Sequence, residues 1–404
     1  MTESWVASTL HMGVVLVSVL AVGIFARGPA AIVTVTAYAG VSDVLWRATN
    51  AKGPYEASKY AVIVGAIFLA VRFAKESRYR TLGLVLAALL APGAAITIMR
   101  MGAAGREHAA ANLAGLLALA AIVAAWGSLR LTLAEVRGLY LVVLGPIVAL
   151  TASATLGTLR ASDLEWTNEG NLDASAGFGP NQVSSLMALG ALLSVLVAFQ
   201  RGVSWRLRVI AITAAVWLVS QMVLTFSRGG VFGLVLALAA AGLVALLTSG
   251  QRLRTVVAAG VLLAIGIQIM SWAGAFTDGA SDQRFTSTDT TNRWDIAVAD
   301  VELFFAKPIF GSGAGMATFD RGSQQVAAHT EYTRLLAEHG LFGIGVLAVL
   351  AAICVRIVRS GKGWYRMASV GLLVLALGQM THSATRIGSI AIAFGLAALR
   401  EEQS

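Results

Sequence analysis

Charged residues are scarce in this sequence, and that scarcity limits what the protein can be. Of its 404 residues, only 13% are charged, whereas 57% are hydrophobic. An average soluble domain has about 25% charged residues. The mean hydropathy of +0.76 points the same way. The composition therefore excludes an ordinary soluble domain and predicts an integral membrane protein in the lipid bilayer.

Cysteine, proline and N-terminal basic residues are also rare. The single cysteine, Cys354, excludes a disulfide framework and a thiolate metal site. The six prolines leave the apolar runs able to stay helical over the ~20 residues that a bilayer crossing needs. Residues 1–9 contain no Lys or Arg, so we expect no cleavable signal peptide and a first span that is kept.

The apolar runs predict an all-α membrane protein. They do not alternate apolar and polar residues as the strands of a membrane β-barrel do. We expect about 12 to 13 transmembrane helices, because the first run is a weak candidate and only a very short turn joins the last two. The candidate runs lie at 10–26, 30–46, 58–74, 81–99, 108–126, 137–156, 181–199, 207–225, 230–248, 254–274, 341–357, 366–382 and 385–400.

The net charge of +9 does not indicate a nucleic-acid partner, because the Lys and Arg residues are spread over short loops between the apolar runs. Short basic loops mark the cytoplasmic side of a membrane protein. If the spans alternate, the basic loops that share this side are 75–80, 130–137, 201–208, 252–254 and 356–366. The polar loops at 157–180 and 275–340 then face outward.

This topology divides the chain into three parts. Residues 1–274 form transmembrane helices, residues 275–340 form a large outward loop, and residues 341–404 form the C-terminal transmembrane helices. The large loop carries most of the polar residues that lie outside the short basic loops. We therefore expect the chemistry of the protein in that loop.

The pattern within the loop predicts two short helices. Residues 292–305 have apolar side chains at helical spacing, which indicates an amphipathic helix lying along the outer membrane face. A second helix is predicted from about 325 to 340. Between them, the glycine-rich segment 311–315 predicts a flexible turn, and it lacks the Lys-Ser/Thr pair of a phosphate-binding P-loop.

His329, on the second predicted helix, is the best candidate for a general base. Imidazole titrates near neutrality, and an outward helix start keeps it accessible. A surface histidine without a catalytic role is the alternative. His339 and His382 offer the same chemistry, but they lie at a helix end and in a short hairpin. Glu331 is spaced to pair with Arg334 on the same helix.

Arginines at the outward ends of spans are candidate anion ligands, because positive charge is disfavoured there. Alternatively, they snorkel to the headgroups or pair with carboxylates. The arginines of this kind are Arg100, Arg106, Arg160, Arg228 and Arg386.

Arg228 differs from the others because two glycines follow it at the start of a helix. A helix N-terminus favours an anion, and a diphosphate is the natural candidate. The same glycines would also suit a tight helical hairpin with no ligand. At the start of another span, Pro180 and Asn181 read as ordinary helix capping. The loop carboxylates show no recognisable metal-ligand spacing, so we expect no metal site.

These motifs, in this order, resemble the O-antigen ligase and polymerase superfamily of polytopic bacterial membrane proteins. The resemblance covers roughly residues 178 to 360, and the first ~170 residues add only hydrophobic spans. The motifs that carry it are Gly179-Pro180-Asn181, Ser227-Arg228-Gly229, Arg293-Trp294, Lys307-Pro308-Ile309-Phe310-Gly311-Ser312-Gly313, His329-Thr330-Glu331-Tyr332 and Glu338-His339-Gly340-Leu341-Phe342-Gly343.

The resemblance implies a multi-span, GT-C-like glycosyltransferase that needs no metal or other cofactor. Such a ligase moves a glycan from undecaprenyl diphosphate to a sugar hydroxyl of lipid A-core, on the periplasmic face of the bacterial inner membrane. By the same resemblance, His329 activates the acceptor hydroxyl, and Arg228 and Arg293 bind the diphosphate. Arg160 is added as a ligand on topology alone. Candidates for supporting roles are Tyr332, Glu331 and Asn181.

Three other functions stay open at this stage. A polymerase of the same superfamily performs identical chemistry with a second carrier-linked glycan, and another envelope glycan is an alternative acceptor. A transporter would need charged groups inside the spans, where Asp43 is the main exception to an apolar interior. A structural scaffold would tolerate the loss of His329 or Arg228.

Overall fold

The structure of the protein is a computed structural model. It describes residues 4–73, 79–127, 129–161, 166–167, 169–248, 252–287, 293–322, 326, 328–382 and 384–402. The elements within these ranges are helical apart from two strands of two residues each. The prediction of an all-α membrane protein is therefore confirmed.

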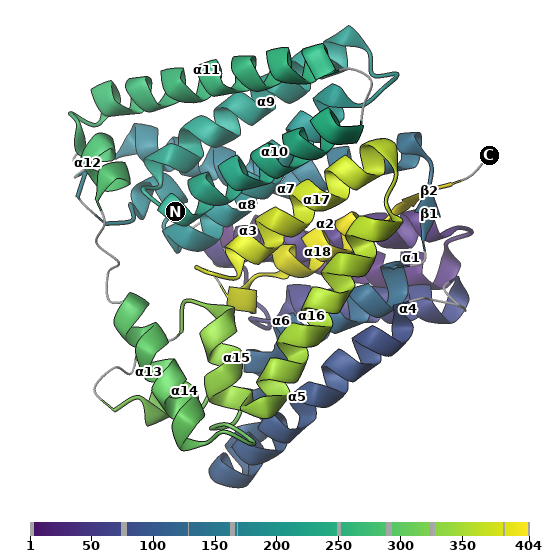
Figure 1. Cartoon of the computed structure of the whole chain (residues 1–404), viewed down its shortest axis with the longest axis vertical. Helices are drawn as coiled ribbons and strands as arrows, with labels where there is room; N and C mark the ends of the chain where they lie inside the picture. The colour runs from purple at the N-terminus through teal and green to yellow at the C-terminus, as the bar shows by residue number, and fades with distance from the viewer. Residues whose placement is uncertain are drawn as a thin grey trace.

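Ten helical stretches in the described part of the chain are long and apolar enough to cross a membrane. Their packing forms a bundle of roughly aligned helices (Figure 1). They are α1 (Ser4–Phe25), α2 (Pro29–Val41) with α3 (Asp43–Ala48), α5 (Arg80–Met101), α6 (Ala103–Trp126), α7 (Leu133–Arg160), α8 (Pro180–Phe199), α9 (Trp205–Leu224), α10 (Arg228–Thr248), α11 (Arg252–Phe276) and α16 (Leu341–Ser360).

Three further predicted runs are helices of less than 18 residues. They are α4 (Ala57–Arg72), α17 (Gly363–Gln379) and α18 (Gly388–Ala398). Every residue of α18 is buried, and this helix packs against α17, α6 and α2 in the middle of the bundle. Each of the predicted apolar runs thus has a helix in the structure, and the expected 12 to 13 spans exceed the ten long stretches by these shorter helices.

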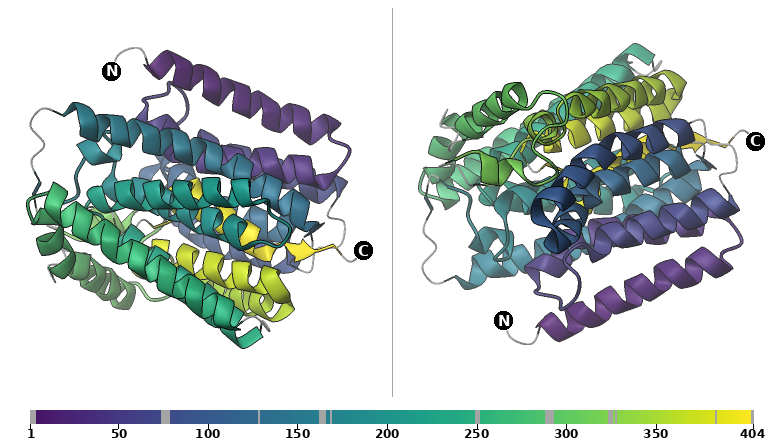
Figure 2. Two further views of the ribbon diagram at one scale, coloured as in Figure 1. Left: turned by 90° about the horizontal axis from the view of Figure 1, so that it is seen from above. Right: turned by 90° about the horizontal axis from the view of Figure 1, so that it is seen from below.

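The two ends of the bundle differ in character. At one end lie the helices of the large loop: α12 (Ala280–Thr286), α13 (Arg293–Ala306), α14 (Ala317–Asp320) and α15 (Glu331–His339). At the other end, β1 (Arg130–Leu131) pairs in parallel with β2 (Arg400–Glu401). Figure 2 shows the two termini at these opposite ends, the N-terminus on the side of the large loop.

The basic loops gather at the end that holds β1 and β2. Arg400 Nε donates a hydrogen bond to Ser360 Oγ at 3.0 Å, and Arg137 Nη1 donates to Gln200 Oε1 at 3.5 Å. These contacts join the loops near residues 130, 200, 360 and 400, as the alternating topology requires. Which end faces the cytoplasm stays a prediction from the positive charge of these loops.

The predicted amphipathic helix exists as α13, and its apolar face points away from the bundle. Trp294, Val298 and Phe305 are 69%, 40% and 73% exposed. An exposed row of large apolar side chains suits contact with lipid. That contact remains a prediction.

The glycine-rich segment 311–315 is buried, so the prediction of a flexible turn is wrong. Hydrogen bonds from its backbone amides hold the segment against α15 and α5. Ser312 N donates to Ala337 O at 2.9 Å, and Ala314 N donates to Gly93 O at 3.1 Å. A Cβ on Gly311, whose φ is +70°, would come within 2.4 Å of the Glu338 backbone. The glycines are needed because the chain passes closely between α5 and α15.

The second loop helix begins later than predicted. It starts at Glu331 after Thr330, whose extended backbone and side-chain bond to Tyr332 N form the N-cap. Glu331 N donates to Met380 O at 2.8 Å, a partner outside the helix. His329 consequently precedes α15, and the prediction that it lies on that helix, on one face with Tyr332, is wrong.

Candidate active site

The first residues of α8, α10 and α13 meet at the loop end of the bundle. Asn181 Oδ1 accepts a hydrogen bond from Ser227 Oγ at 2.9 Å and another from Arg293 Nη2 at 3.5 Å. The side chain of Asn181 therefore joins the Ser227-Arg228 motif to the large loop. It does not cap α8, whose N-cap is Gly179, so the prediction of ordinary capping is wrong for this side chain.

Arg228 is held at the first position of α10. Its Nη1 donates to the backbone carbonyl of Ser287 in the large loop. The turn before it contains Phe226 at φ +57°, a conformation that costs a bulky residue about 1–3 kcal/mol. Stacking on Trp166, with ring centres 5.2 Å apart, and a bond from Arg284 Nε to the Phe226 carbonyl hold this turn. The turn fixes where α10 begins, and so where Arg228 lies.

His329 is half-buried among arginines. Burial, followed by the guanidinium groups of Arg293 and Arg386, lowers the pKa of His329 to about 4. Arg386 also donates to the carbonyl of Ala328, the residue before the histidine. At neutral pH the imidazole is therefore uncharged and can accept a proton. Arg293 and Arg386, which come from distant parts of the sequence, therefore lie near His329.

Arg293 and Arg228 lie within electrostatic range of one another. Burial, followed by the charge of Arg228, lowers the pKa of Arg293. The Nε of Arg293 is buried and makes no hydrogen bond within the described ranges. Two neighbouring guanidinium groups with a spare buried donor form a site of positive potential, which attracts an anion.

His382, which ranked below His329 in the sequence because it lies in a short hairpin, belongs to this group of residues. Its Nε2 lies 2.9 Å from Ser185 Oγ, and its Nδ1 lies 3.1 Å from the carbonyl of Gly378. A Cβ added to Gly229 would come within 2.5 Å of the imidazole, so the ring lies against the start of α10. It is also within electrostatic range of Arg293. The sequence of the short hairpin does not indicate that His382 lies here, because the packing of α10 on α17 brings the two segments together.

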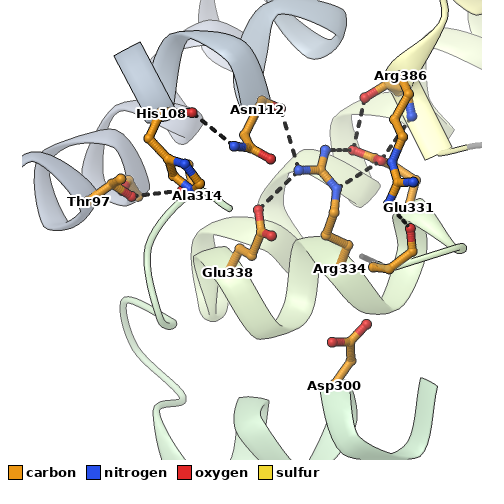
Figure 3. Close-up of polar contacts among 12 residues, drawn as sticks. Thr97, His108, Asn112, Asp300, Ala314, Glu331, Arg334, Glu338 and Arg386 are labelled. Carbon is orange, nitrogen blue, oxygen red and sulfur yellow. Dashed lines mark hydrogen bonds and ion pairs between the residues drawn. The ribbon is translucent and has the colours of Figure 1, made fainter. Parts of the chain in front are cut away.

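Glu331 and Tyr332 join α15 to the hairpin after α17 and to α17 itself, respectively. Glu331 forms an ion pair with Arg334, with Nη2–Oε1 at 2.5 Å, and accepts from Thr385 N at 3.0 Å (Figure 3). Tyr332 OH donates to the carbonyl of Leu377 at 2.9 Å. The predicted pairing of Glu331 with Arg334 is confirmed. Both supporting candidates act here as parts of the frame around His329.

A buried ion pair joins α13 to the end of α14, and a hydrogen bond joins α13 to α15. Arg321 Nε lies 2.9 Å from Asp300 Oδ1, and both side chains are 0% exposed. Thr333 on α15 donates to Asp300 Oδ2 at 2.9 Å. The positions of Arg293 at the start of α13 and of His329 before α15 are thereby linked.

Other predicted anion ligands stand apart from this group. Arg100 binds Asp320 through two bonds of 2.7 and 2.8 Å, as the carboxylate-pairing alternative expects. Arg160 is exposed at the end of α7, and no described hydrogen bond or ion pair joins it to Arg228, Arg293 or His329. Within the ranges that the structure covers, no cluster of three or more His, Cys, Asp or Glu residues could hold a metal ion.

The site falls largely within a recognised family domain. A protein-family model described as O-antigen ligase matches residues 213–348, from within α9 to within α16. The match includes Arg228, Arg293 and His329, whereas Asn181 and His382 lie outside it. No curated protein matches the chain. The match covers about a third of the chain, and it supports the resemblance to the O-antigen ligase superfamily.

Proposed function

We propose that this protein is an O-antigen ligase of the bacterial inner membrane. It would move a glycan from undecaprenyl diphosphate to a sugar hydroxyl of lipid A-core, at an active site facing the periplasm. The family domain and the membrane helices support an enzyme of the ligase and polymerase type. The observation that carries the finer proposal is the convergence of Arg228, Arg293 and His329 at one end of the bundle.

Arg228 and Arg293 are suited to bind the diphosphate of the donor. A guanidinium pairs with phosphate oxygens through a planar fork and stays charged at any working pH. The two arginines repel each other without an anion between them, so a diphosphate relieves that repulsion. The start of α10 adds the positive end of a helix dipole at Arg228. Asn181 holds the guanidinium of Arg293 in place.

His329 is suited to take the proton of the acceptor hydroxyl. In the reaction, the acceptor oxygen forms a bond to the anomeric carbon, and the bond from that carbon to the diphosphate oxygen breaks. The bonding electron pair goes to the diphosphate, whose charge Arg228 and Arg293 stabilise. The hydroxyl proton goes to His329. The donor is already activated, so positioning and electrostatics supply the catalysis and we expect no metal requirement.

Donor binding would also strengthen the base. The pKa of His329 is low because of burial and of positive neighbours that include Arg293. A bound diphosphate offsets that positive charge, and an opposite charge nearby raises the pKa of a histidine. The imidazole would therefore become a better proton acceptor when the donor is in place.

The remaining predicted residues take smaller parts. Glu331 and Tyr332 are proposed as positioning residues, because their polar atoms already bond to Arg334, Thr385 and Leu377 within the protein. Arg160 is exposed at the end of α7, a place that suits a contact with lipid headgroups or with the donor glycan more than with the diphosphate.

A polymerase is the second candidate, because the superfamily contains both activities and the chemistry is the same. The test uses purified protein in detergent with EDTA, carrier-linked glycan and lipid A-core. Transfer of the glycan to lipid A-core is the expected result. Lengthening of the carrier-linked glycan, without modified lipid A-core, would establish the polymerase instead. Absence of both products, with any acceptor, would favour a transporter.

A further inference from the structure

A cavity of about 310 Å³ opens near the N-terminal helices, and the proposed chemistry makes no use of it. Its walls come from α1 and α3, from the segment that leads to α4, and from the residues that precede α8. Side chains that line it include Asp43, Trp46, Arg47, Tyr55 and Phe178. This part of the chain lies outside the family match.

Two hydrogen bonds through Arg386 link the cavity wall to the residue next to the base. Arg47, in the cavity wall, donates from Nη1 to the carbonyl of Arg386 at 3.3 Å. Arg386 in turn donates from its guanidinium to the carbonyl of Ala328, next to His329. The cavity wall is therefore connected to the segment that carries the proposed base.

The polar part of the cavity wall is rigid. Arg47 Nη2 lies 3.0 Å from Asp43 Oδ1, and the two side chains are only 5% and 3% exposed. Asp43 Oδ2 also accepts from Gly388 N, at the start of α18, at 3.1 Å. A buried ion pair held by the backbone of another helix can offer charged donors and acceptors to a ligand without reorganising.

The apolar part of the wall is aromatic. Tyr55 is 62% exposed, and the Arg47 guanidinium carbon lies 3.8 Å from the centre of its ring. This cation–π contact holds the ring against the ion pair while leaving much of the residue exposed. Trp46 is buried and donates to His11 Nδ1 at 3.0 Å, which fixes its orientation. Phe178, just before α8, is half-buried and also lines the cavity.

We propose that this cavity binds the terminal sugar of the acceptor, a proposal that rests on the ligase function proposed above. A sugar ring has an apolar C–H face that packs on an aromatic ring, and hydroxyls that bond to carboxylate and guanidinium groups. The volume lies at the low end of the ~300–1,000 Å³ typical of small-molecule sites, which suits a sugar unit and not a long glycan.

The position of the cavity favours the acceptor over the donor. The diphosphate ligands Arg228 and Arg293 come from α10 and α13, whereas the cavity walls come from the N-terminal helices. Arg386, which bonds to Arg47 in the cavity wall, also contributes to the positive surroundings of His329. An acceptor bound in the cavity would thus approach the base from the N-terminal helices and past Arg386, apart from the two diphosphate ligands.

The test is a kinetic comparison at saturating donor, with lipid A-core as the varied acceptor. Tyr55→Ala should raise the KM for lipid A-core about tenfold, since it removes the exposed aromatic face. Tyr55→Phe keeps that face and should have a KM near that of the wild type. Tyr60→Ala is the matched control, because Tyr60 is 43% exposed on α4 and does not line the cavity. The KM for the donor should stay unchanged in all three variants.

The outcomes separate this proposal from the function on which it rests. A KM for lipid A-core that Tyr55→Ala leaves unchanged overturns the acceptor site, while transfer by the wild type still supports the ligase. A rise in the donor KM alone assigns the cavity to the donor and also overturns the proposal. Absence of transfer in the wild type refutes the ligase function itself.

Discussion

Replacing Gly229 by alanine tests how the Ser227-Arg228-Gly229 motif is positioned. An added Cβ would come within 2.5, 2.6 and 2.7 Å of Cγ, Cδ2 and Nδ1 of His382. The imidazole has little room to move, because Ser185 and Gly378 contact its two nitrogens at 2.9 and 3.1 Å. The start of α10 and the hairpin after α17 must therefore separate.

Overpacking of this kind typically costs about 1–3 kcal/mol of stability. Gly242, on the same helix, is the matched control, because a Cβ there meets nothing within 4 Å. Its replacement by alanine should stabilise the helix by up to about 1 kcal/mol. The two variants add the same methyl group to α10 with opposite expected effects on stability.

The assay is thermal unfolding of the purified variants in one detergent, together with glycan transfer. Gly229→Ala should unfold at a lower temperature than the wild type and lose at least about tenfold in transfer rate, because a shift of about 1 Å in a site can cost ~10²-fold. Gly242→Ala should keep wild-type transfer. If Gly229→Ala is as stable and as active as Gly242→Ala, the contact between α10 and His382 is wrong.

Two further predictions concern the large loop. Asp300→Ala leaves the buried Arg321 without its partner and should destabilise the protein by about 3–5 kcal/mol. Glu302→Ala, at an exposed position of the same helix, should change stability by less than about 0.5 kcal/mol, and equal melting temperatures for the two variants would contradict the ion pair. The pKa of His329 is lowered from 6.5 to about 4, so kcat/KM should stay level as the pH falls through 6.5 and decline only near 4. A decline of kcat/KM centred at pH 6.5 would show that the pKa of His329 is not lowered in the free enzyme.

The same pKa shift has a consequence for stability. His329 binds its proton less readily in the folded protein than in the unfolded chain, so protonation favours the unfolded chain. Its contribution to stability is therefore complete above pH 6.5. That contribution is lost as the pH falls from 6.5 toward 4.

The sequence was a good guide to elements that depend on local composition. Each apolar run is a helix because a long apolar segment satisfies its backbone bonds internally. The lengths of the helices were predicted less well from the sequence. The helix α18 has 11 residues and is fully buried, yet its sequence is as apolar as that of a longer span. An apolar sequence indicates that a segment is removed from water. It does not distinguish burial in the protein from contact with lipid.

The site was predictable only where charged residues interrupt an apolar pattern. Arg228 stood out for that reason and His329 because it lies in the polar loop, whereas His382 had neither signal. The contact of His382 with Ser185 spans 197 residues of sequence, and no local pattern encodes it. The start of α15 was missed for a related reason, because the tertiary bond from Glu331 N to Met380 O decides it. The link between the proposed acceptor cavity and the base is likewise non-local, because the Arg47–Arg386 hydrogen bond spans 339 residues of sequence.

The most direct test of the central claim measures donor binding and glycan transfer separately, in EDTA, for Arg228→Ala and His329→Ala. Arg106→Ala is the control, because Arg106 is exposed near the start of α6, at the same end of the bundle. We predict that Arg228→Ala loses affinity for carrier-linked glycan, and that His329→Ala binds the donor but transfers no glycan to lipid A-core. Wild-type transfer by either folded variant would contradict the proposed active site.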